Sequence, residues 1–333
     1  MANMKDIAKM AGVSVVTVSR VVNNSANVGD ETRKKVQKAI KELNYKPSRV
    51  AKRLRSTVAS GNLLGVLIPD IQNPFYIDVL NGIEEIAYKN NYALIMCNFN
   101  QDEEKQAKYI DMLMAEAVDG MIVAPVNAED EKIINVIESG LPIVCVDRGL
   151  KDVDVDVDVV LVDNKRGAFL AVEHIIKSGY KRIAYISGKP AIPSSKQREE
   201  GYISALNKYG IKIDKSIIKY GDSSHKSGVT LSNELLNSIN PPDAIFTGNN
   251  LITLGALETI HKMGLKIPEE IAIVGFDDMY WSNSLNPPLT AVRQPAHEIG
   301  KRAIELLIQR IEDPNKSTVQ MILNADLIQR KSC

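Results

Sequence analysis

Short apolar runs alternate with amphipathic helical patterns from residue 63 onward. The runs are continuous rather than alternately polar, which is typical of strands buried on both faces of a parallel sheet. The segments between them place apolar residues three and four positions apart, which predicts helices that cover the sheets. The runs are too many for one sheet, so we expect two α/β lobes. The predicted strands are residues 63–68, 93–97, 120–123, 143–146, 159–162, 182–187, 244–247, 271–276, 319–323 and 325–328.

The first 43 residues show the helical period instead and predict three short helices. The first spans residues 4–10, and a tight turn leads into the second, whose free backbone N–H groups the Ser14 hydroxyl can cap. The inner face of the second helix carries Val18, Val21 and Val22, and its outer face carries Val15, Val16, Ser19 and Arg20. This outer face suits a helix laid into the major groove of DNA. A small packing helix is the alternative.

A third helix is predicted over residues 30–43, with a basic solvated side, and Pro47 stops it from continuing. Residues 48–56, SRVAKRLRS, then form a short basic segment that is too small to be a stable helix alone. Two interpretations fit this segment equally well. It is either a solvated linker or a segment that orders on DNA beside a partner copy, with Leu54 wedged between bases in the minor groove.

Charge is divided unevenly along the 333-residue chain. The totals cancel, with 41 basic and 41 acidic residues. Residues 1–60 hold 13 basic and 4 acidic residues, a net charge of +9, and the rest holds 28 basic and 37 acidic residues, a net charge of −9. A basic module on an acidic body is typical of a nucleic-acid-binding protein with a separate domain for another task.

Cysteines and apolar segments bear on the cellular compartment. Two of the three cysteines, Cys97 and Cys145, lie in predicted strands, so we expect buried thiols and no disulfide framework. The first residues have no signal-peptide core, and no apolar run reaches the length of a membrane span. We therefore expect a cytoplasmic protein with no membrane partner.

Polar and aromatic side chains follow many of the predicted strands, at the edge where open parallel sheets bind ligands. They are Asn73, Pro74, Phe75, Tyr76, Asp147, Arg148, Asp163, Asn164, Arg198, Asn249, Asp277 and Gln294. Carboxylate, amide and guanidinium groups can bracket sugar hydroxyls, and an aromatic ring can cover a sugar's C–H face. Each residue has a purely structural alternative, because Asn73 before Pro74, for example, is a good helix N-cap. The repeated placement favours a sugar pocket.

Several motifs resemble those of the LacI/GalR family of bacterial transcription repressors. The most specific are GVSVVTVSRVVN and TRKKVQKAIKELNYKPSRVAKRL near the start, with NPFY, VDR, SGYKRIAYISG, VGFDD and NPPLTAVRQP in the body. The resemblance covers nearly the whole chain. It implies a homodimeric, non-enzymatic repressor of a sugar-utilisation operon that a small sugar controls allosterically.

The resemblance also implies roles at DNA. Each protomer would place its second helix in the major groove of a pseudo-palindromic, double-stranded operator. Val15, Val16 and Arg20 would read bases, since arginine suits guanine and valine suits a thymine methyl group. The residues implied to touch phosphates are Ser14, Thr17, Ser19 and Asn23, and Leu54 is implied to enter the minor groove.

The core resembles periplasmic sugar-binding proteins of the ribose type. The residues implied to hold the effector are Asn73, Phe75, Asp147, Arg148, Arg198, Asn249, Asp277 and Gln294. The VDR triplet is shared with ribose-type binders, so the expected effector is a free monosaccharide, ribose or a close relative, with no cofactor and no metal. Ser223 stands where an aromatic ring often stacks on the sugar, which leaves that role to Phe75, Tyr76 or Trp281.

The implied organisation is an α/β core behind a helix-turn-helix domain. That domain covers residues 1–47, a hinge segment covers 48–61, and a two-lobed effector-binding core like that of periplasmic binding proteins covers 62–333. Lobe 1 comprises about residues 62–161 and 292–323, and lobe 2 comprises about residues 162–291 and 324–333. No heptad segment for tetramer formation follows the last predicted strand, which favours a dimer. The acidic tract at residues 151–160 matches no calcium loop and favours a solvated rim.

Three alternatives assign other functions. An enzyme is disfavoured, because the sequence has no GxSxG, no P-loop and no GxGxxG after a strand, and its four histidines are not at metal-ligand spacing. An exported sugar-binding protein would need a signal peptide where the basic helices stand. The third alternative keeps the fold but uses a phosphoprotein partner or a purine corepressor. The VDR triplet argues against the purine, and the partner stays open.

Overall fold

The computed structural model describes residues 3–22, 28–43, 62–150 and 157–333. The chain divides into two compact units, Met1–Gly61 and Asn62–Cys333. Four features predicted from the sequence lie outside the described residues: Asn23, Leu54, the hinge segment at 48–61 and positions 151–156 of the acidic tract.

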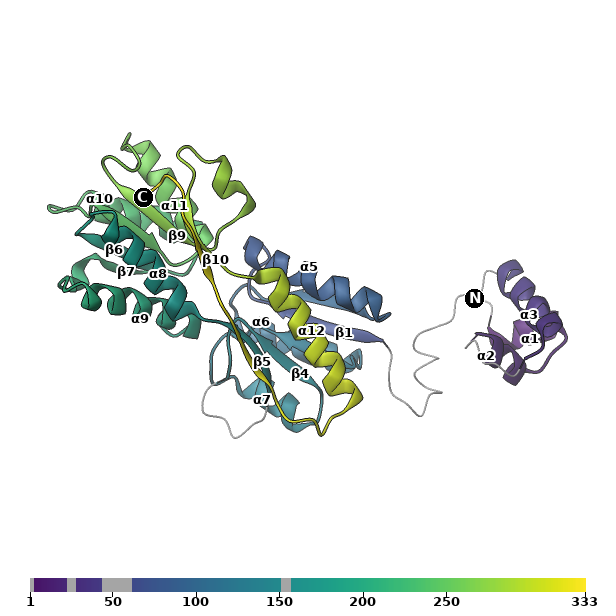
Figure 1. Cartoon of the computed structure of the whole chain (residues 1–333). Helices are drawn as coiled ribbons and strands as arrows, with labels where there is room; N and C mark the ends of the chain where they lie inside the picture. Colours follow the sequence, from purple (N-terminus) through teal and green to yellow (C-terminus); the bar gives the residue numbers. More distant parts are fainter. Residues whose placement is uncertain (1–2, 23–27, 44–61, 151–156) are drawn as a thin grey trace. The chain divides into compact units, whose positions relative to one another are not determined.

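Three helices make up the described part of the amino-terminal unit (Figure 1). They are α1 (Met4–Ala11), α2 (Val15–Val22) and α3 (Asp30–Glu42). Their shared core consists of Ile7, Ala8, Val18, Val21, Val36 and Ala39. Gly12 ends α1 with a φ of 67°, a left-handed conformation that glycine adopts without strain, and this allows the tight turn into α2. The three predicted helices are confirmed, as is the burial of Val18 and Val21, whereas Val22 is only partly buried.

Lobe 1 of the core contains a six-stranded parallel sheet with the strand order β11-β5-β4-β3-β1-β2. Its strands are β1 (Leu63–Ile68), β2 (Ala93–Asn98), β3 (Gly120–Val123), β4 (Ile143–Val146), β5 (Asp158–Val162) and β11 (Gln320–Leu323). Its helices are α5 (Pro74–Lys89), α6 (Glu103–Ala115), α7 (Glu131–Glu138) and α12 (Ala296–Glu312). The strands β3 and β4 are buried along their whole length, which explains their continuous apolar sequences.

Lobe 2 repeats this arrangement with the strand order β12-β10-β9-β8-β6-β7, in which only β12 runs antiparallel to its neighbour. Its strands are β6 (Ile183–Ser187), β7 (Ile218–Tyr220), β8 (Ala244–Thr247), β9 (Ala272–Phe276), β10 (Thr290–Arg293) and β12 (Asp326–Ile328). Its helices are α8 (Asn164–Lys177), α9 (Pro193–Lys208), α10 (His225–Leu236) and α11 (Asn250–Lys262), with short 3-10 turns at Lys215–Ile217 and Tyr280–Ser284. In lobe 1 the strand β1 lies between β2 and β3, and in lobe 2 the strand β6 lies between β7 and β8. Each sheet therefore has a topological switch point, which is where open α/β sheets bind ligands.

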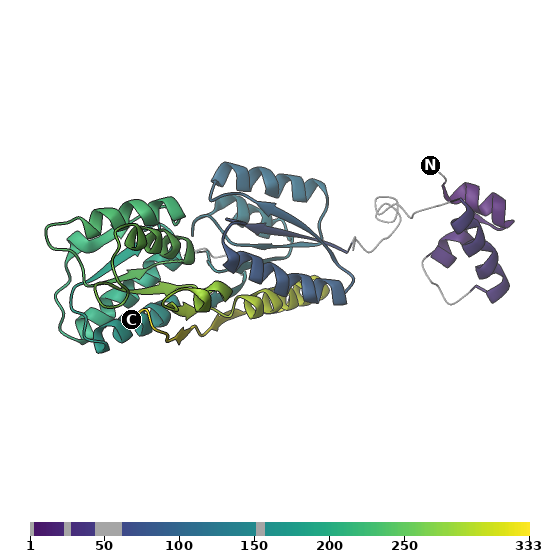
Figure 2. The same ribbon diagram turned by 90° about the horizontal axis from the view of Figure 1, so that it is seen from above.

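The chain passes between the two sheets three times, from β5 to α8, from β10 to α12 and from β11 to β12. After the second passage α12 lies beside α5, far from it in sequence, as Figures 1 and 2 both show. After the third passage the last residues bind lobe 2. Arg330 there donates hydrogen bonds to the Asp278 carboxylate at 2.7 and 3.0 Å, and the Ser332 hydroxyl accepts from the Thr290 N–H at 2.8 Å. Both lobes are therefore built from separated stretches of the chain.

All ten predicted strands are present, each within one residue of its expected ends. Two more strands, β7 and β10, were not predicted, because each is only three or four residues long and pairs with a sheet that forms elsewhere in the sequence. Cys97 and Cys145 are buried free thiols as expected, and burial raises the pKa of Cys145 to about 12.

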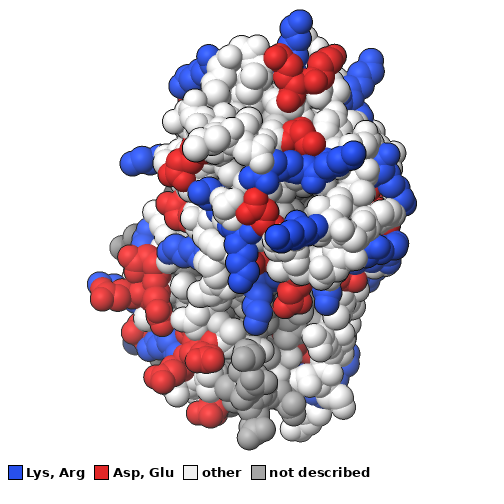
Figure 3. All heavy atoms as spheres, turned by 90° about the vertical axis from the view of Figure 1, so that its left-hand side faces the viewer, with Lys and Arg blue, Asp and Glu red and all other residues white. Residues whose placement is uncertain are grey.

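The surface of lobe 2 on the side of α9 and α10 carries basic and acidic side chains next to one another (Figure 3). Many are paired, such as Lys208 with Glu173 at 2.8 Å and Arg182 with Asp214 at 2.7 Å. A surface of mixed sign does not attract phosphates as a field of one sign does. In the described part of the chain, no helix is both long and apolar enough to cross a lipid bilayer.

Candidate effector pocket and DNA-reading helix

A pocket of about 340 Å³ lies in the core where the carboxyl ends of the two sheets face each other. The structure places all eight predicted effector residues in its lining: Asn73, Phe75, Asp147, Arg148, Arg198, Asn249, Asp277 and Gln294. They follow β1, β4, β8, β9 and β10 or lie on α9, so elements of both lobes contribute. A pocket of this size with convergent polar groups suits a small polar ligand.

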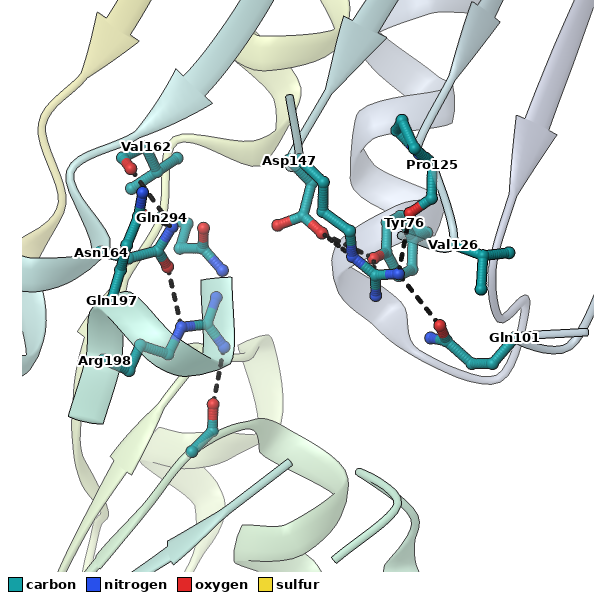
Figure 4. A network of polar contacts seen from close by, with 12 residues as sticks. Tyr76, Gln101, Pro125, Val126, Asp147, Val162, Asn164, Gln197, Arg198 and Gln294 are labelled. Carbon is teal, nitrogen blue, oxygen red and sulfur yellow. Dashed lines mark hydrogen bonds and ion pairs between the residues drawn. The ribbon is translucent and has the colours of Figure 1, made fainter. Parts of the chain in front are cut away.

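The lobe 1 side of the pocket is a hydrogen-bond network in which Arg148 contacts Asp147, Gln101 and Pro125, three residues labelled in Figure 4. Arg148 Nε donates to Asp147 Oδ2 at 3.2 Å, and its Nη1 donates to Gln101 Oε1 at 3.0 Å and to the Pro125 carbonyl oxygen at 3.1 Å. The Tyr76 hydroxyl donates to the same Asp147 oxygen at 2.8 Å. Burial raises the pKa of Tyr76 well above its usual value, so this hydroxyl stays a neutral donor. The network fixes Asp147 as an acceptor at the edge of the pocket.

The lobe 2 side is organised around Arg198 (Figure 4). Its Nε donates to Asn164 Oδ1 at 2.8 Å, and its Nη1 donates to the Gly248 carbonyl oxygen at 2.6 Å. The guanidinium lies over the Phe276 ring, 3.8 Å from the ring centre. Arg198 is buried and forms no ion pair with any described residue. The guanidinium is therefore held rigidly at the pocket wall, where a ligand can contact its positive charge.

Asp277 and Gln294 form the third polar pair. Gln294 donates through Nε2 to Asp277 Oδ1, and Asn250 N–H donates weakly to Oδ2 at 3.4 Å. Burial raises the pKa of Asp277 above its ordinary value, although the positive charge of Arg198 acts in the opposite direction. The amide oxygen of Gln294, Oε1, is buried without a hydrogen-bond partner among the described residues. Both groups therefore gain from a ligand that supplies hydrogen-bond donors.

Two asparagines cap helices at the pocket wall. Asn73 Oδ1 accepts from Phe75 N–H at 2.9 Å and from Asn250 Nδ2 at 2.8 Å, so Asn73 caps α5 and also links the two lobes. Asn249 Oδ1 accepts from the Ile252 N–H at 2.8 Å and caps α11. The structural alternative considered for Asn73 is thus correct, and the same side chain also lines the pocket.

Strained backbone gathers around the pocket. Of the eight non-glycine residues with positive φ in the described part of the chain, five line it: Asn100, Gln101, Asp147, Ser223 and Asp277, with φ of 55°, 58°, 62°, 69° and 74°. Each such residue costs roughly 1–3 kcal/mol and persists only where its surroundings impose it. This clustering is typical of a binding site.

The pocket lining also contains residues that the sequence analysis did not assign, among them Gln101, Lys189, Ser194, Ser195 and Asp222. They lie in loops or at a helix start, where no local pattern marks them. Of the three aromatic residues considered for the ring face, Phe75 and Tyr76 line the pocket, 5.0 Å apart in an edge-to-face pair. Trp281 is not among the described lining residues and packs beside the lobe 2 core instead.

The second helix of the amino-terminal unit presents the face predicted for DNA. Val15 and Val16 are 40% and 60% exposed, and Arg20 is also exposed. The Ser14 hydroxyl accepts from the Thr17 N–H at 3.1 Å and pairs with the Thr17 hydroxyl at 2.9 Å, so Ser14 begins α2 as expected. Exposed apolar side chains on a short helix are unfavourable in water and suit contact with base edges.

Among the residues whose positions are described, no group of three or more histidine, cysteine, aspartate or glutamate side chains could hold a metal ion.

Two family models match the chain. The model for bacterial regulatory proteins of the lacI family matches residues 3–48. The model for periplasmic binding proteins and the sugar binding domain of the LacI family matches residues 62–331. The HTH-type transcriptional repressor PurR of Mannheimia succiniciproducens is 34% identical over 335 residues, which cover 100% of this chain and 98% of that protein. The PurR of Pasteurella multocida is also 34% identical, with the same coverage.

Solved structures show the same similarity. The lac repressor dimer bound to operator and the anti-inducer ONPF has a TM-score of 0.88 and 28% identity, over 99% of this chain and 98% of that one. A LacI family transcriptional regulator from Enterococcus faecium with bound ribose has a TM-score of 0.73 and 30% identity, over 81% of this chain and 98% of that one. The chain therefore belongs to the LacI family and is a DNA-binding transcriptional repressor with a core like that of periplasmic binding proteins.

Proposed function

We propose that this repressor binds its operator as a homodimer and that a small sugar in the core pocket controls its affinity for DNA. The observation that carries the proposal is the convergence of eight polar or aromatic side chains from both lobes on one pocket of about 340 Å³. Sugar hydroxyls both donate and accept hydrogen bonds, so they can satisfy the Asp147 and Asp277 carboxylates together with the Arg198 guanidinium.

The ring of the sugar fits the two faces of the pocket. Phe75 and Tyr76 offer aromatic surface from α5, and Ser223 on the lobe 2 side offers a hydroxyl in place of a ring. A ligand with one apolar C–H face and hydroxyls at its edge matches this asymmetry. The related regulator with bound ribose supports a monosaccharide of that class.

At the operator, we propose that Val15, Val16 and Arg20 of α2 read bases, with Ser14, Thr17, Ser19 and Asn23 at phosphates and Leu54 in the minor groove. The exposed outer face of α2 supports the base-reading role. The homodimer is supported by the similarity to the operator-bound lac repressor dimer. Two copies would read the two halves of a pseudo-palindromic site.

A purine that acts as corepressor is the second candidate. It is favoured by the relatives named PurR, which match the whole chain. A flat base needs stacking surface on both faces, and the described aromatic residues in the pocket lining, Phe75 and Tyr76, both come from one helix. We therefore place the sugar first.

Calorimetric titration of the full chain with ribose, other pentoses, hexoses, hypoxanthine and guanine separates the two candidates. Fluorescence anisotropy with labelled operator then shows whether the bound ligand raises or lowers DNA affinity, which depends on its differential affinity for the two states. Heat with a sugar and none with a purine supports the proposal. Heat with a purine alone would replace it with the second candidate, and no heat with any sugar in protein that still binds operator would refute it.

A further inference from the structure

The start of α9 presents a group of unused hydrogen-bond donors to the pocket. Pro193 opens this 16-residue helix, and no side chain caps it. Ser194 and Ser195 follow, and their backbone N–H groups are among those at a helix start that lack an intrahelical acceptor. Both side chains line the pocket, are 6% and 9% exposed, and form no hydrogen bond with a described residue. Two serines with free hydroxyls thus line the pocket at the positive end of a helix dipole, beside backbone N–H groups that no side chain caps.

Gly188 and Lys189 lie beside the two serines, and we call these four residues the cradle. Gly188, which follows β6, has no side chain, and a Cβ there would lie 2.3 Å from the Ser223 hydroxyl oxygen and 2.8 Å from that of Ser195. The absence of a side chain therefore leaves open the space on which two hydroxyls converge. Lys189, the next residue, lines the pocket, is exposed and forms no ion pair with a described residue.

Like Lys189, Arg198 is a basic side chain in the pocket lining. It lies one turn beyond Ser194 on α9, and its guanidinium forms no ion pair with a described residue, although its charge acts on the Asp277 carboxyl. Asp222 is one of four aspartates in the pocket lining, and its pKa is lowered, chiefly because the Ser224 hydroxyl hydrogen-bonds to its carboxylate. Its Oδ1 also accepts the Ser224 N–H at 3.0 Å. The Asp222 carboxylate is therefore already hydrogen-bonded within its own turn. The positive charges of Lys189 and Arg198 remain available to an anionic group of the ligand.

We infer that the effector is a phosphate monoester of a monosaccharide, with the phosphate held by Ser194, Ser195 and Lys189 at the start of α9. This inference rests on the sugar pocket proposed above and replaces the free monosaccharide expected from the sequence with a phosphorylated one. A phosphate monoester carries a charge of about −1.5 to −2 at neutral pH and three acceptor oxygens, which match two backbone N–H groups, two hydroxyls and one ammonium group. A free sugar has no group that uses the helix dipole and Lys189 together.

Calorimetry on the full chain tests this inference with matched pairs of ligands. The probes are ribose and ribose 5-phosphate, glucose and glucose 6-phosphate, fructose and fructose 6-phosphate, and inorganic phosphate alone. In at least one pair the ester should bind at least about tenfold more tightly than the free sugar, because each hydrogen bond to a charged group is worth about that factor. Inorganic phosphate alone should bind more weakly than that ester.

Three variants assign the effect to the cradle. Lys189→Met and Ser195→Ala should each lower the preference for the ester over the free sugar about tenfold. Asp222→Asn should raise that preference, because it removes a like charge while keeping the oxygen that accepts the Ser224 N–H. Lys196→Met, which removes an exposed lysine on the same helix that is outside the pocket lining, is the matched control and should leave the preference unchanged.

The outcomes separate this inference from the proposed function. Equal or tighter binding of the free sugar in every pair overturns the phosphate subsite but keeps the sugar pocket. Loss of binding to both members of a pair in the same proportion in Ser195→Ala and Lys189→Met also overturns it. Inorganic phosphate that binds as tightly as the best ester would show a free-anion site instead. Failure of every sugar and every ester to bind, in protein that still binds operator, overturns the sugar pocket itself.

Discussion

Asp277 is predicted to lower the stability of the ligand-free core, so Asp277→Asn should raise it. The carboxyl is 3% exposed, and burial raises its pKa above the ordinary value of 3.8, against the opposing charge of Arg198. A carboxyl whose pKa is higher in the folded than in the unfolded protein costs stability once it ionises. That cost is absent below the ordinary pKa, grows as the pH rises towards the folded pKa, and is complete above it.

The size of the effect follows from the contacts that the substitution keeps. Gln294 now donates to Asp277 and leaves its own Oε1 without a partner among the described residues. If the Gln294 amide rotates by half a turn, Gln294 Oε1 can accept a hydrogen bond from the amide nitrogen of the new asparagine. The asparagine's own oxygen still faces the Asn250 N–H. No hydrogen bond need be lost, so removing the charge should stabilise the core by about 1 kcal/mol, as is common when a functional group is neutralised. The melting temperature should rise by about 2–4 °C.

Thermal unfolding without ligand, at pH 7.5 and at pH 4, measures this effect. The rise in melting temperature should be present at pH 7.5 and smaller at pH 4, where the Asp277 carboxyl of the parent is less ionised. The affinity for sugar should fall, because an asparagine amide is a weaker acceptor for ligand hydroxyls than a carboxylate. Asp278→Asn, at the next position, is the comparison variant with the opposite expectation, because the pKa of Asp278 is lowered by its partners and the substitution should reduce stability at pH 7.5. A lower melting temperature for Asp277→Asn at pH 7.5, or a gain of the same size at both pH values, would refute the reasoning.

Three further predictions concern neighbouring charges and the DNA helix. Asp278→Asn should destabilise the core by about 3 kcal/mol in chemical denaturation, because it removes a buried carboxylate that pairs with the largely buried Arg330 and the more exposed Arg293. Arg198→Ala should weaken effector binding at least about 100-fold by calorimetry, since charged hydrogen bonds are worth about 1.5–3 kcal/mol each, while operator affinity stays unchanged. Arg20→Ala should weaken operator binding by about 1–3 kcal/mol in anisotropy titrations.

Each of these three predictions has a result that would contradict it. The pKa of Asp278 is lowered overall, because hydrogen bonds from Arg330 and Arg293 outweigh the effect of burial, so its contribution to stability should disappear as the pH falls through that lowered pKa. An Asp278→Asn variant as stable as the parent would contradict this account. Loss of operator binding in Arg198→Ala would place that residue in the fold rather than the pocket. An equal loss on random DNA in Arg20→Ala would refute base reading.

The strands of the core were predictable because most of them are continuous apolar runs that are buried on both faces. β7 and β10 were not, since IKY and TAVR owe their strand conformation to pairing with β6 and β9 rather than to their own sequence. These backbone hydrogen bonds join residues that are far apart in the chain, so the local sequence pattern of β7 or β10 does not predict them.

The pocket was predictable where its residues directly follow strands, because parallel strands bring their carboxyl ends to one edge. Asp147 and Asp277 are examples, and both have the positive φ of a sharp turn. Gln101, Ser194 and Lys189 were missed, because they reach the pocket through loops or a helix start whose direction only the folded core determines. Trp281 was wrongly considered for the ring face, because aromatic character alone does not distinguish a pocket wall from the neighbouring core.

The passage from β11 to β12 has a consequence for the synthesis of this protein on the ribosome. β11 completes the sheet of lobe 1, and β12 with Arg330 and Ser332 completes that of lobe 2. The sheet of lobe 1 therefore cannot be completed before Leu323 has been synthesised, and that of lobe 2 cannot be completed before Ile328, although domains usually fold in order as they emerge. A stop codon shortly after Asn324 would therefore leave lobe 1 with all six strands of its sheet but would remove the edge strand β12 from lobe 2.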